Sequence, residues 1–234
     1  NIKIKSGIKP HWRLKLDEEP IEWNDMIHGK ITFNNLSVSD PVVFRSDEMP
    51  LFTITSVVDD SEMNVSHILR GDDHITNTAA QIKLFKLLEA KIPNFGHFPL
   101  VKSKSGKGLS KRTDSYSVKE FKKKKIFSIV ILNFLNKIGS SQSIEEIHGL
   151  DSLIELFDLN KFSKNSVFFD PSDIERLNSK YIKRINIEYL DNNYSTGISK
   201  KFWEIIRSNV DTVDEAIEWD SLIKEEFNII NRII

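Results

Sequence analysis

The segment His67–Gln81, HILRGDDHITNTAAQ, decides the fold because it contains the change from strand to helix. A short strand-like run, His67–Leu69, is followed by the charged turn Arg70–His74. Thr78–Gln81 has the spacing of a capping box, in which hydroxyl and amide side chains satisfy backbone N–H groups at a helix start. Apolar residues then recur at helical period. We therefore predict a strand, a charged turn and a helix that ends near Ala90.

The flanking segments extend this pattern. Leu51–Asp60, LFTITSVVDD, contains a nearly unbroken β-branched run from Thr53 to Val58, which is typical of a strand covered on both faces. Phe95–Lys102 has the pattern of another strand. Together these segments predict a strand–helix–strand crossover in a parallel sheet. Ligands in open α/β sheets bind beyond the carboxyl ends of strands, so the charged turn is predicted to lie beside a nucleotide.

The loop Gly106–Arg112, GKGLSKR, follows the last of these predicted strands. Glycines let a backbone approach a phosphate, and a lysine supplies the opposite charge. A solvated surface loop would have a similar composition. The position of the loop at a strand's carboxyl end favours anion binding.

Composition sets further bounds. The chain has 234 residues, of which 39% are hydrophobic, so it can form one large domain or two smaller ones. Lys and Arg total 33 against 34 for Asp and Glu, so binding to nucleic acid would depend on local clusters of charge. The absence of cysteine excludes disulfides and thiolate zinc sites and fits the cytoplasm. No apolar run approaches 18 residues, which predicts no membrane span, and the start at Asn1 leads us to expect a preceding segment.

The two ends of the chain differ in pattern. From Trp12 to about Asp60, short β-type runs are separated by turn residues, among them HWRLKL, GKITF and PVVFR. Beyond residue 115 the pattern is helical, with Gly139 as a helix stop. Capping boxes are predicted at Ser117–Glu120, Ser143–Glu146 and Ser172–Glu175, and further helices at Ile187–Asn193, Ser199–Ser208 and Trp219–Ile234.

Three stretches together resemble the glutamyl-tRNA synthetases, which are class I aminoacyl-tRNA synthetases. They are LFTITSVVDD with HILRGDDHITNTAAQ, the loop GLSKR, and FDPSDIERLNSKYIKR, and their order and spacing agree from about Asp40 to Arg184. The resemblance implies an α/β fold: the second half of a Rossmann-type nucleotide-binding sheet, between a β-rich remnant of an inserted domain and a helical region. It divides the chain into the end of an acceptor-binding insertion (1–50), the half-Rossmann domain (51–106), the signature loop with a stem-contact domain (107–186), and the start of an anticodon-binding helical bundle (187–234).

The sequence departs from the family pattern at several positions. The first signature lysine aligns with Gly108, beside Lys107, whereas the second is present as Lys111. Phe52 occupies the position of a tyrosine whose hydroxyl contacts the amino acid in the family. The His-Ile-Gly-His signature does not occur. Its absence is explained if the chain begins inside the inserted domain.

The resemblance implies an amino-acid site at Arg70 and Phe52. A guanidinium is suited to a carboxylate because its planar fork binds both oxygens. A structural salt bridge from Arg70 to Asp72 or Asp59 is the alternative.

The resemblance also implies a nucleotide site for ATP. Lys111 and Ser110 are the implied catalytic residues: the lysine would follow the charge that builds on the phosphates, and the serine would donate a hydrogen bond. Mg²⁺ would bind with ATP, and no zinc site is expected. Asp73 would accept hydrogen bonds from the ribose, unless it serves only as a helix N-terminal charge. The other implied ATP-binding residues are His74, Leu100, Val101, Gly108, Leu109 and Arg112, of which Leu100 and Val101 could equally be ordinary strand core.

Contacts with tRNA are implied on the downstream helix. Its cationic residues share roughly one face, and the resemblance places this helix under the tRNA stem. They are Arg176, Lys180, Lys183 and Arg184. The run Lys122–Lys125 is either a second RNA contact or a solvated helix face.

The implied function is ATP-dependent attachment of L-glutamate to tRNA(Glu), through a glutamyl-adenylate, by a cytoplasmic monomer. Whether tRNA(Gln) is also charged is left open, and this segment alone is expected to be inactive. A paralogue that glutamylates a modified tRNA nucleoside is one alternative. Glutaminyl-tRNA synthetase is another, disfavoured by the loop GLSKR and the segment RGDDH. A non-catalytic RNA-binding remnant would fit Gly108 and Phe52.

Overall fold

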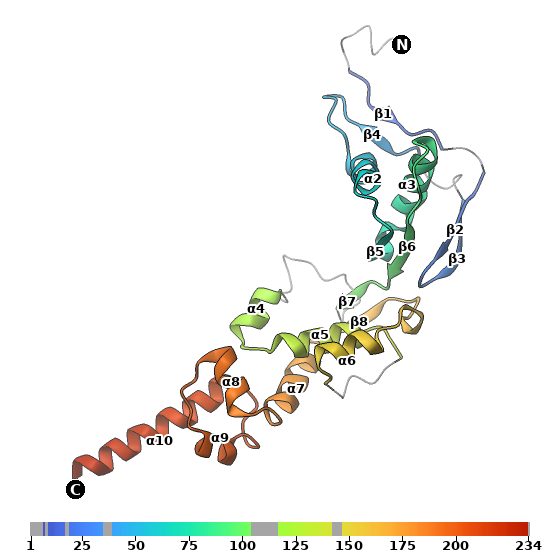
Figure 1. Cartoon of the computed structure of the whole chain (residues 1–234). Helices are drawn as coiled ribbons and strands as arrows, with labels where there is room; N and C mark the ends of the chain where they lie inside the picture. The colour runs from blue at the N-terminus through green and yellow to red at the C-terminus, as the bar shows by residue number, and fades with distance from the viewer. Residues whose placement is uncertain are drawn as a thin grey trace. The chain divides into compact units, whose positions relative to one another are not determined.

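The computed structural model describes residues 7, 9–16, 19–34, 39–103, 117–141 and 147–233, with the backbone alone for 226–233. The chain forms two compact units, whose elements are labelled in Figure 1. Unit 1 contains residues 1–100 and 158–166, and unit 2 contains residues 101–157 and 167–234. None of the described helices combines the length and apolar character that crossing a membrane requires.

Unit 1 begins with two antiparallel strand pairs. β1 (Trp12–Arg13) pairs with β4 (Val42–Phe44), and β2 (Ile21–Asp25) forms a hairpin with β3 (Gly29–Phe33). Gly29 has a φ of 74°, which glycine adopts without the steric cost that a Cβ would impose. The predicted β-type runs HWRLKL, GKITF and PVVFR each contain one of these strands.

The centre of unit 1 is a parallel strand pair joined by a helix. β5 (His67–Gly71) pairs with β6 (Asn94–Phe98), and the connection contains the 3-10 helix η2 (Asp72–His74) and α3 (Ile75–Leu87). This confirms the predicted strand, charged turn and helix. Figure 1 shows α3 alongside α2 (Phe52–Glu62), and the two helices pack together over the core of the unit.

The segment Leu51–Asp60 was predicted as a buried strand, and this prediction is wrong because the segment forms most of α2. Only Val57 of this helix is fully buried, whereas a strand covered on both faces would bury every residue. The hydroxyls of Thr55 and Ser56 donate to carbonyls one turn back, so both find an acceptor within the helix itself. Tertiary packing on α3 therefore outweighs the local β propensity.

Two boundaries near the parallel pair also differ from the prediction. Thr78–Gln81 is not a capping box, because α3 begins at Ile75 and both side chains are buried inside the helix. The predicted strand Phe95–Lys102 is divided into β6 and β7 (Val101–Ser103) around Pro99, which has no N–H for a strand ladder. β7 pairs in parallel with β8 (Val167–Phe169) in unit 2.

Unit 2 is helical around one hydrophobic core, which extends from Phe121 to Ala216 and so continues across residue 187. The cap at Ser117 is confirmed, since its hydroxyl accepts from the backbone N–H of Glu120. The cap at Ser172 is wrong, because Asp170 caps this helix and Pro171 takes the first helical position. The predicted cap Ser143–Glu146 lies outside the described residues. The helices are α4 (Val118–Lys123), α5 (Ser128–Lys137), α6 (Leu150–Leu156), α7 (Pro171–Ile182), α8 (Ile187–Tyr194), α9 (Lys200–Ile206) and α10 (Val213–Ile233).

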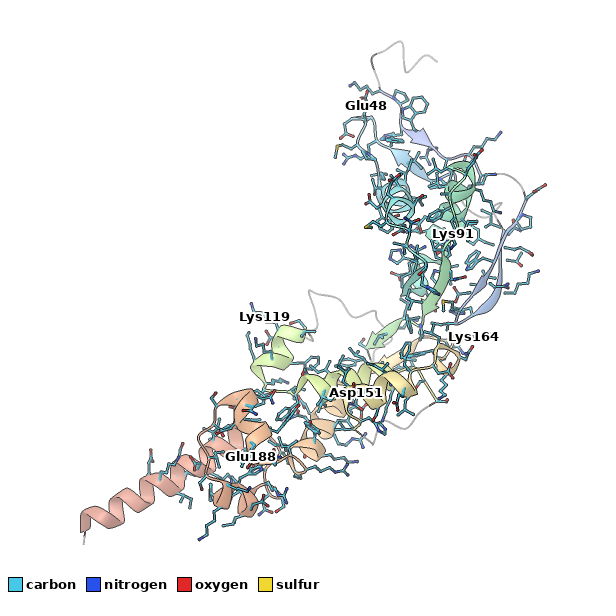
Figure 2. The ribbon with its side chains drawn as sticks, viewed as in Figure 1. Glu48, Lys91, Lys119, Asp151, Lys164 and Glu188 are labelled. Carbon is cyan, nitrogen blue, oxygen red and sulfur yellow. The ribbon has the colours of Figure 1, made fainter. Side chains whose placement is uncertain are left out.

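A buried charge ties the hairpin of unit 1 to the parallel pair. Asp25, at the end of β2, accepts from the ring Nδ1 of His97 on β6 at 2.6 Å, and both side chains are fully buried. The same carboxylate accepts from the backbone N–H groups of Ile27, His28 and His97. Lys164, labelled in Figure 2, donates to the carbonyl of His28 at 2.9 Å and so fastens the same turn from outside.

Burial by itself would raise the pKa of Asp25. The hydrogen bonds from His97 and from the backbone of His28, Ile27 and His97 outweigh it and hold the pKa well below its usual range. A carboxyl whose pKa is depressed by folding stabilises the folded state fully above its unfolded pKa, near 4, and loses that contribution as the pH falls further.

We expect Trp203→Ala to lower the free energy of unfolding by about 4 kcal/mol, because this side chain is fully buried and its loss leaves a cavity. Its indole N–H also donates to the carbonyl of Ile185 at 3.1 Å. Ile205→Ala, on the exposed face of the same helix, is the control and should change stability by less than about 1 kcal/mol. Urea denaturation checks both, and equal losses would contradict the described core.

We expect Asp25→Asn to lower the free energy of unfolding at pH 7 by about 3 kcal/mol, since it removes a buried ionised acceptor. The difference from the unchanged protein should narrow as the pH falls below about 4, because Asp25 then takes up a proton in the unfolded chain while the folded chain keeps it ionised down to its depressed pKa. Exposed Asp59→Asn serves as the control. Urea midpoints measured from pH 7 to pH 3 test this, and a pH-independent difference would show that the ionised carboxylate contributes nothing.

Candidate active site

Arg70 lies at the end of β5, and its guanidinium is held by two side chains from α3. Its Nη2 group donates to the hydroxyl of Thr78 and, at 2.6 Å, to Oε1 of Gln81. The guanidinium also lies 5.5 Å from the ring centroid of Phe95. Among the described residues it forms no salt bridge with Asp72 or Asp59. The described structure therefore does not contain the salt bridge that was the alternative to substrate binding.

One donor of Arg70 lacks a partner among the residues that the structure describes. Within the described part of the chain, its buried Nε has no hydrogen-bond partner. Burial lowers the pKa of Arg70, while the carboxylates of Asp60 and Asp73 act in the opposite direction. An unpaired, buried, charged donor is costly, and a carboxylate oxygen would satisfy it. The site therefore fits an anionic ligand.

Four of the residues predicted for the site, Phe52, Asp73, His74 and Leu100, lie in unit 1 with Arg70. Phe52, exposed at the start of α2, contacts the ring of His74 edge-on, with centroids 6.0 Å apart. A Cβ added at Gly71 would lie 2.7 Å from Oδ1 of Asp73 and 3.4 Å from Leu100. Glycine at position 71 therefore allows the carboxylate of Asp73 and the side chain of Leu100 to approach the same turn.

The other predicted ATP-binding residues lie in unit 2 or outside the described part of the chain. Val101 opens β7 and packs against the core of unit 2. The loop residues Gly108, Leu109, Ser110, Lys111 and Arg112 lie outside the described residues. In the described ranges, no group of three or more His, Asp or Glu side chains is placed to hold a metal ion.

Two of the four cations of the predicted tRNA face, Arg176 and Lys183, form ion pairs with acids of unit 2. Lys183 donates to Asp211 at 2.6 Å, and Arg176 to Asp173 at 3.3 Å. Lys124, from the lysine run, donates to Glu175 at 2.7 Å, and both residues line a cavity of about 620 Å³. Lys180 is half-buried on α7. Arg184 is exposed, and its side chain forms no hydrogen bond or ion pair with the described residues. Arg184, just beyond the end of α7, is therefore the cation of the predicted tRNA face best placed to meet a phosphate.

Sequence reasoning missed the polar residues behind Arg70. Asp25, Thr78, Gln81 and His97 are buried and hydrogen-bonded, yet they come from three segments far apart in sequence. The sequence pattern predicts Thr78 and Gln81 as a capping box, and it assigns no role to Asp25 or His97. The only sequence signal was the presence of a histidine, His97, and an aspartate, Asp25, inside otherwise apolar strand patterns. This signal does not reveal that the two side chains are partners.

Comparisons with known proteins identify the family of this chain. Residues 2–176 match the family model of tRNA synthetases class I (E and Q), catalytic domain. Glutamate–tRNA ligase 1 of Wolbachia sp. subsp. Brugia malayi is 40% identical over 223 residues, which cover 94% of this chain and 50% of that protein. Glutamate–tRNA ligase 2 of Bartonella tribocorum is 41% identical over 237 residues, covering 95% and 52% respectively.

A solved structure supports the fold. The glutamate-tRNA synthetase of Elizabethkingia anophelis matches with a TM-score of 0.76 at 22% identity, over 93% of this chain and 50% of that one. The mixed α/β architecture with parallel strand pairs is thus that of a Rossmann-like class I synthetase. The chain spans about half the length of the curated relatives it matches. Since the family model covers well over half of the sequence, the chain belongs to the catalytic-domain family of the class I glutamyl- and glutaminyl-tRNA synthetases.

Proposed function

We propose that this chain is part of a glutamate–tRNA ligase, which attaches L-glutamate to tRNA(Glu) at the expense of ATP. The observation that carries this is Arg70: a half-buried guanidinium at a strand end, oriented by neutral side chains, with its Nε unpaired among the described residues. Such a group is suited to a substrate carboxylate. The curated names of relatives at about 40% identity support glutamate as the amino acid.

The reaction has two steps. A carboxylate oxygen of glutamate attacks the α-phosphorus of ATP, the bond to the β-phosphate oxygen breaks, and pyrophosphate leaves. A terminal ribose hydroxyl of tRNA then attacks the activated carbonyl, loses its proton and expels AMP. The protein mainly has to place two anions against each other and stabilise the charge that develops on the phosphates.

Each side chain of the proposed site has a role in this scheme. Arg70 binds a carboxylate of glutamate, Asp73 accepts from the ribose, and His74 stacks on the adenine, whose apolar edge is formed by Leu100 and Val101. Phe52 offers no hydroxyl to the amino acid and instead orients His74 through their edge-on contact. Lys111 and Ser110, with Gly108, Leu109 and Arg112 around them, stabilise the triphosphate. Mg²⁺ supplies further countercharge when it is bound with ATP.

The same proposal assigns the rest of the chain. Residues 1–50 and 51–106 belong to the acceptor-binding insertion and the half-Rossmann domain, and 107–186 and 187–234 to the stem-contact and anticodon-binding regions. The enzyme works as a monomer in the cytoplasm. Arg176, Lys180, Lys183 and Arg184 face the tRNA stem. Whether tRNA(Gln) is a second substrate depends on contacts to the anticodon.

We expect the protein expressed from its complete reading frame to catalyse ATP–pyrophosphate exchange with glutamate and tRNA. Arg70→Gln should lower kcat/KM for glutamate about 100-fold, because two hydrogen bonds to a charged carboxylate are lost. Arg45→Gln, at an exposed arginine of unit 1, is the matched control and should retain activity.

The outcomes separate the alternatives. No exchange by the unchanged protein, with tRNA binding retained, would show the RNA-binding remnant. Transfer of glutamate to tRNA whose terminal ribose has been cleaved by periodate would show the nucleoside-modifying paralogue. Exchange with glutamine and not glutamate would show the glutaminyl enzyme. Full activity of Arg70→Gln would remove this residue from the amino-acid site.

We expect Arg184→Ala to weaken tRNA binding and to reduce the slope of log affinity against log salt by about one unit, since one phosphate contact is lost. The neighbouring Lys183→Ala should change the slope less, because Lys183 is already paired with Asp211. Filter binding at several salt concentrations measures both. An unchanged slope for Arg184→Ala would place the tRNA stem elsewhere.

A further inference from the structure

Arg70 is oriented by neutral side chains, although acidic residues lie near it. The carboxylates of Asp60 and Asp73 influence its pKa, yet neither is among its hydrogen-bond partners in the described residues. A direct ion pair would offset the positive charge and compete with an incoming carboxylate for the same donors. Orientation through neutral groups leaves the charge available to a substrate.

The neutral partner Thr78 is the end of a buried chain of hydrogen bonds. The hydroxyl of Thr78 lies 2.8 Å from Nε2 of His97, and Nδ1 of His97 lies 2.6 Å from Oδ2 of Asp25. Thr78 and His97 are fully buried, so water does not compete for these contacts. We propose that Asp25, His97 and Thr78 form a relay that positions the Arg70 guanidinium for glutamate, a role that rests on the proposed function.

The protons of this relay can be assigned from its partners. A carboxylate only accepts, so His97 donates from Nδ1 to Asp25, and Nε2 is left to accept from the hydroxyl of Thr78. The oxygen of Thr78 then accepts from Nη2 of Arg70. Every donor thus points toward the charge of Asp25.

The hydroxyl proton of Thr78 has a second acceptor, the carbonyl of His74, at the longer distance of 3.1 Å. If the proton were directed there, His97 would have to donate from both ring nitrogens and carry a positive charge. That charge would lie one hydroxyl away from the guanidinium of Arg70 and repel it. The shorter contact to His97 is therefore the one that the electrostatics favour.

A second arm holds the other proton of the same Nη2 group. Oε1 of Gln81 accepts from Arg70 at 2.6 Å, Nε2 of Gln81 donates to the hydroxyl of Ser56 at 2.5 Å, and Ser56 donates to the carbonyl of Phe52 at 2.7 Å. Both protons of Nη2 are thus committed to the protein. Two acceptors on one nitrogen fix the plane of the guanidinium, and Nη1 and Nε remain for the ligand.

Asp25, at the start of the relay, connects the hairpin turn to the segment that carries Arg70. Asp25 opens the turn between β2 and β3, and His28 in the same turn contacts Asp72 at 2.7 Å through Nε2. The turn therefore contacts the segment that carries Arg70 and Asp73 directly through His28 and indirectly through His97. An element outside the parallel pair thereby sets the geometry of the amino-acid site.

Thr78→Val tests the relay because it replaces the hydroxyl with a methyl group of similar shape, and Thr78→Ser is its matched control because it keeps the hydroxyl. In the full-length protein we expect Thr78→Val to raise KM for glutamate about 10-fold in pyrophosphate exchange, with kcat and KM for ATP within about twofold of the unchanged protein. Thr78→Ser should restore KM for glutamate. Similar defects in both variants, or no defect in Thr78→Val, would overturn the relay.

A spectroscopic measurement separates failure of the relay from failure of the proposed function. In ¹⁵N NMR spectra of the unchanged protein, the ring of His97 should show the neutral tautomer protonated at Nδ1. The Nε–H signal of Arg70 should be that of an ordered side chain, and this order should be lost in Thr78→Val. A ring protonated at Nε2 would overturn the relay, whatever the activity or the folding of the variant. Absence of exchange in the unchanged protein would overturn the proposed function alone.

Discussion

The ionised carboxylate of Asp25 is the constraint on which the rest of unit 1 depends. A charge inside a protein is tolerated only when hydrogen bonds replace the water it has lost. Here the replacements are the ring of His97 and three backbone N–H groups, which come from the hairpin turn and from β6. These donors can converge only when the hairpin docks on the parallel pair in one register, so the charge specifies the arrangement of strands that are distant in sequence.

That arrangement has a consequence for the site. The hydrogen bonds that satisfy Asp25 continue through His97 to Thr78, and Thr78 is one of the two acceptors that hold Arg70. The charge of Arg70 stays uncompensated by a direct ion pair, and its Nε stays unpaired among the described residues. A site with these properties is organised before its ligand arrives, which reduces the ordering cost of binding. The half-buried position strengthens any bond to a carboxylate, since fewer waters compete.

Unit 2 balances charge in a different way. Several of its cations are paired with acids, as Lys183 is with Asp211 and Lys124 with Glu175. Exposed pairs of this kind contribute little to stability, but they lower the net positive field of the surface. Cations without such partners, of which Arg184 is an example among the described residues, then dominate any phosphate contact. This is consistent with a chain whose total charge is near zero, for which any binding to nucleic acid would depend on local placement of charge.

Motif order and helical period were sufficient, from the sequence by itself, to determine the family, the strand–turn–helix at His67–Gln81 and the helical character of the second half, and to propose Arg70 as a substrate ligand. These properties are local or depend on spacing along the chain. The tertiary structure alone decided that Leu51–Asp60 is a helix, because packing on α3 outweighs β propensity. It also decided that Thr78 and Gln81 hold Arg70 and do not cap a helix, because their partners lie on β5, α2 and β6. The role of a buried polar side chain depends on the atoms that surround it. Sequence spacing does not indicate those atoms when they come from segments more than 70 residues apart, as Asp25 and His97 do.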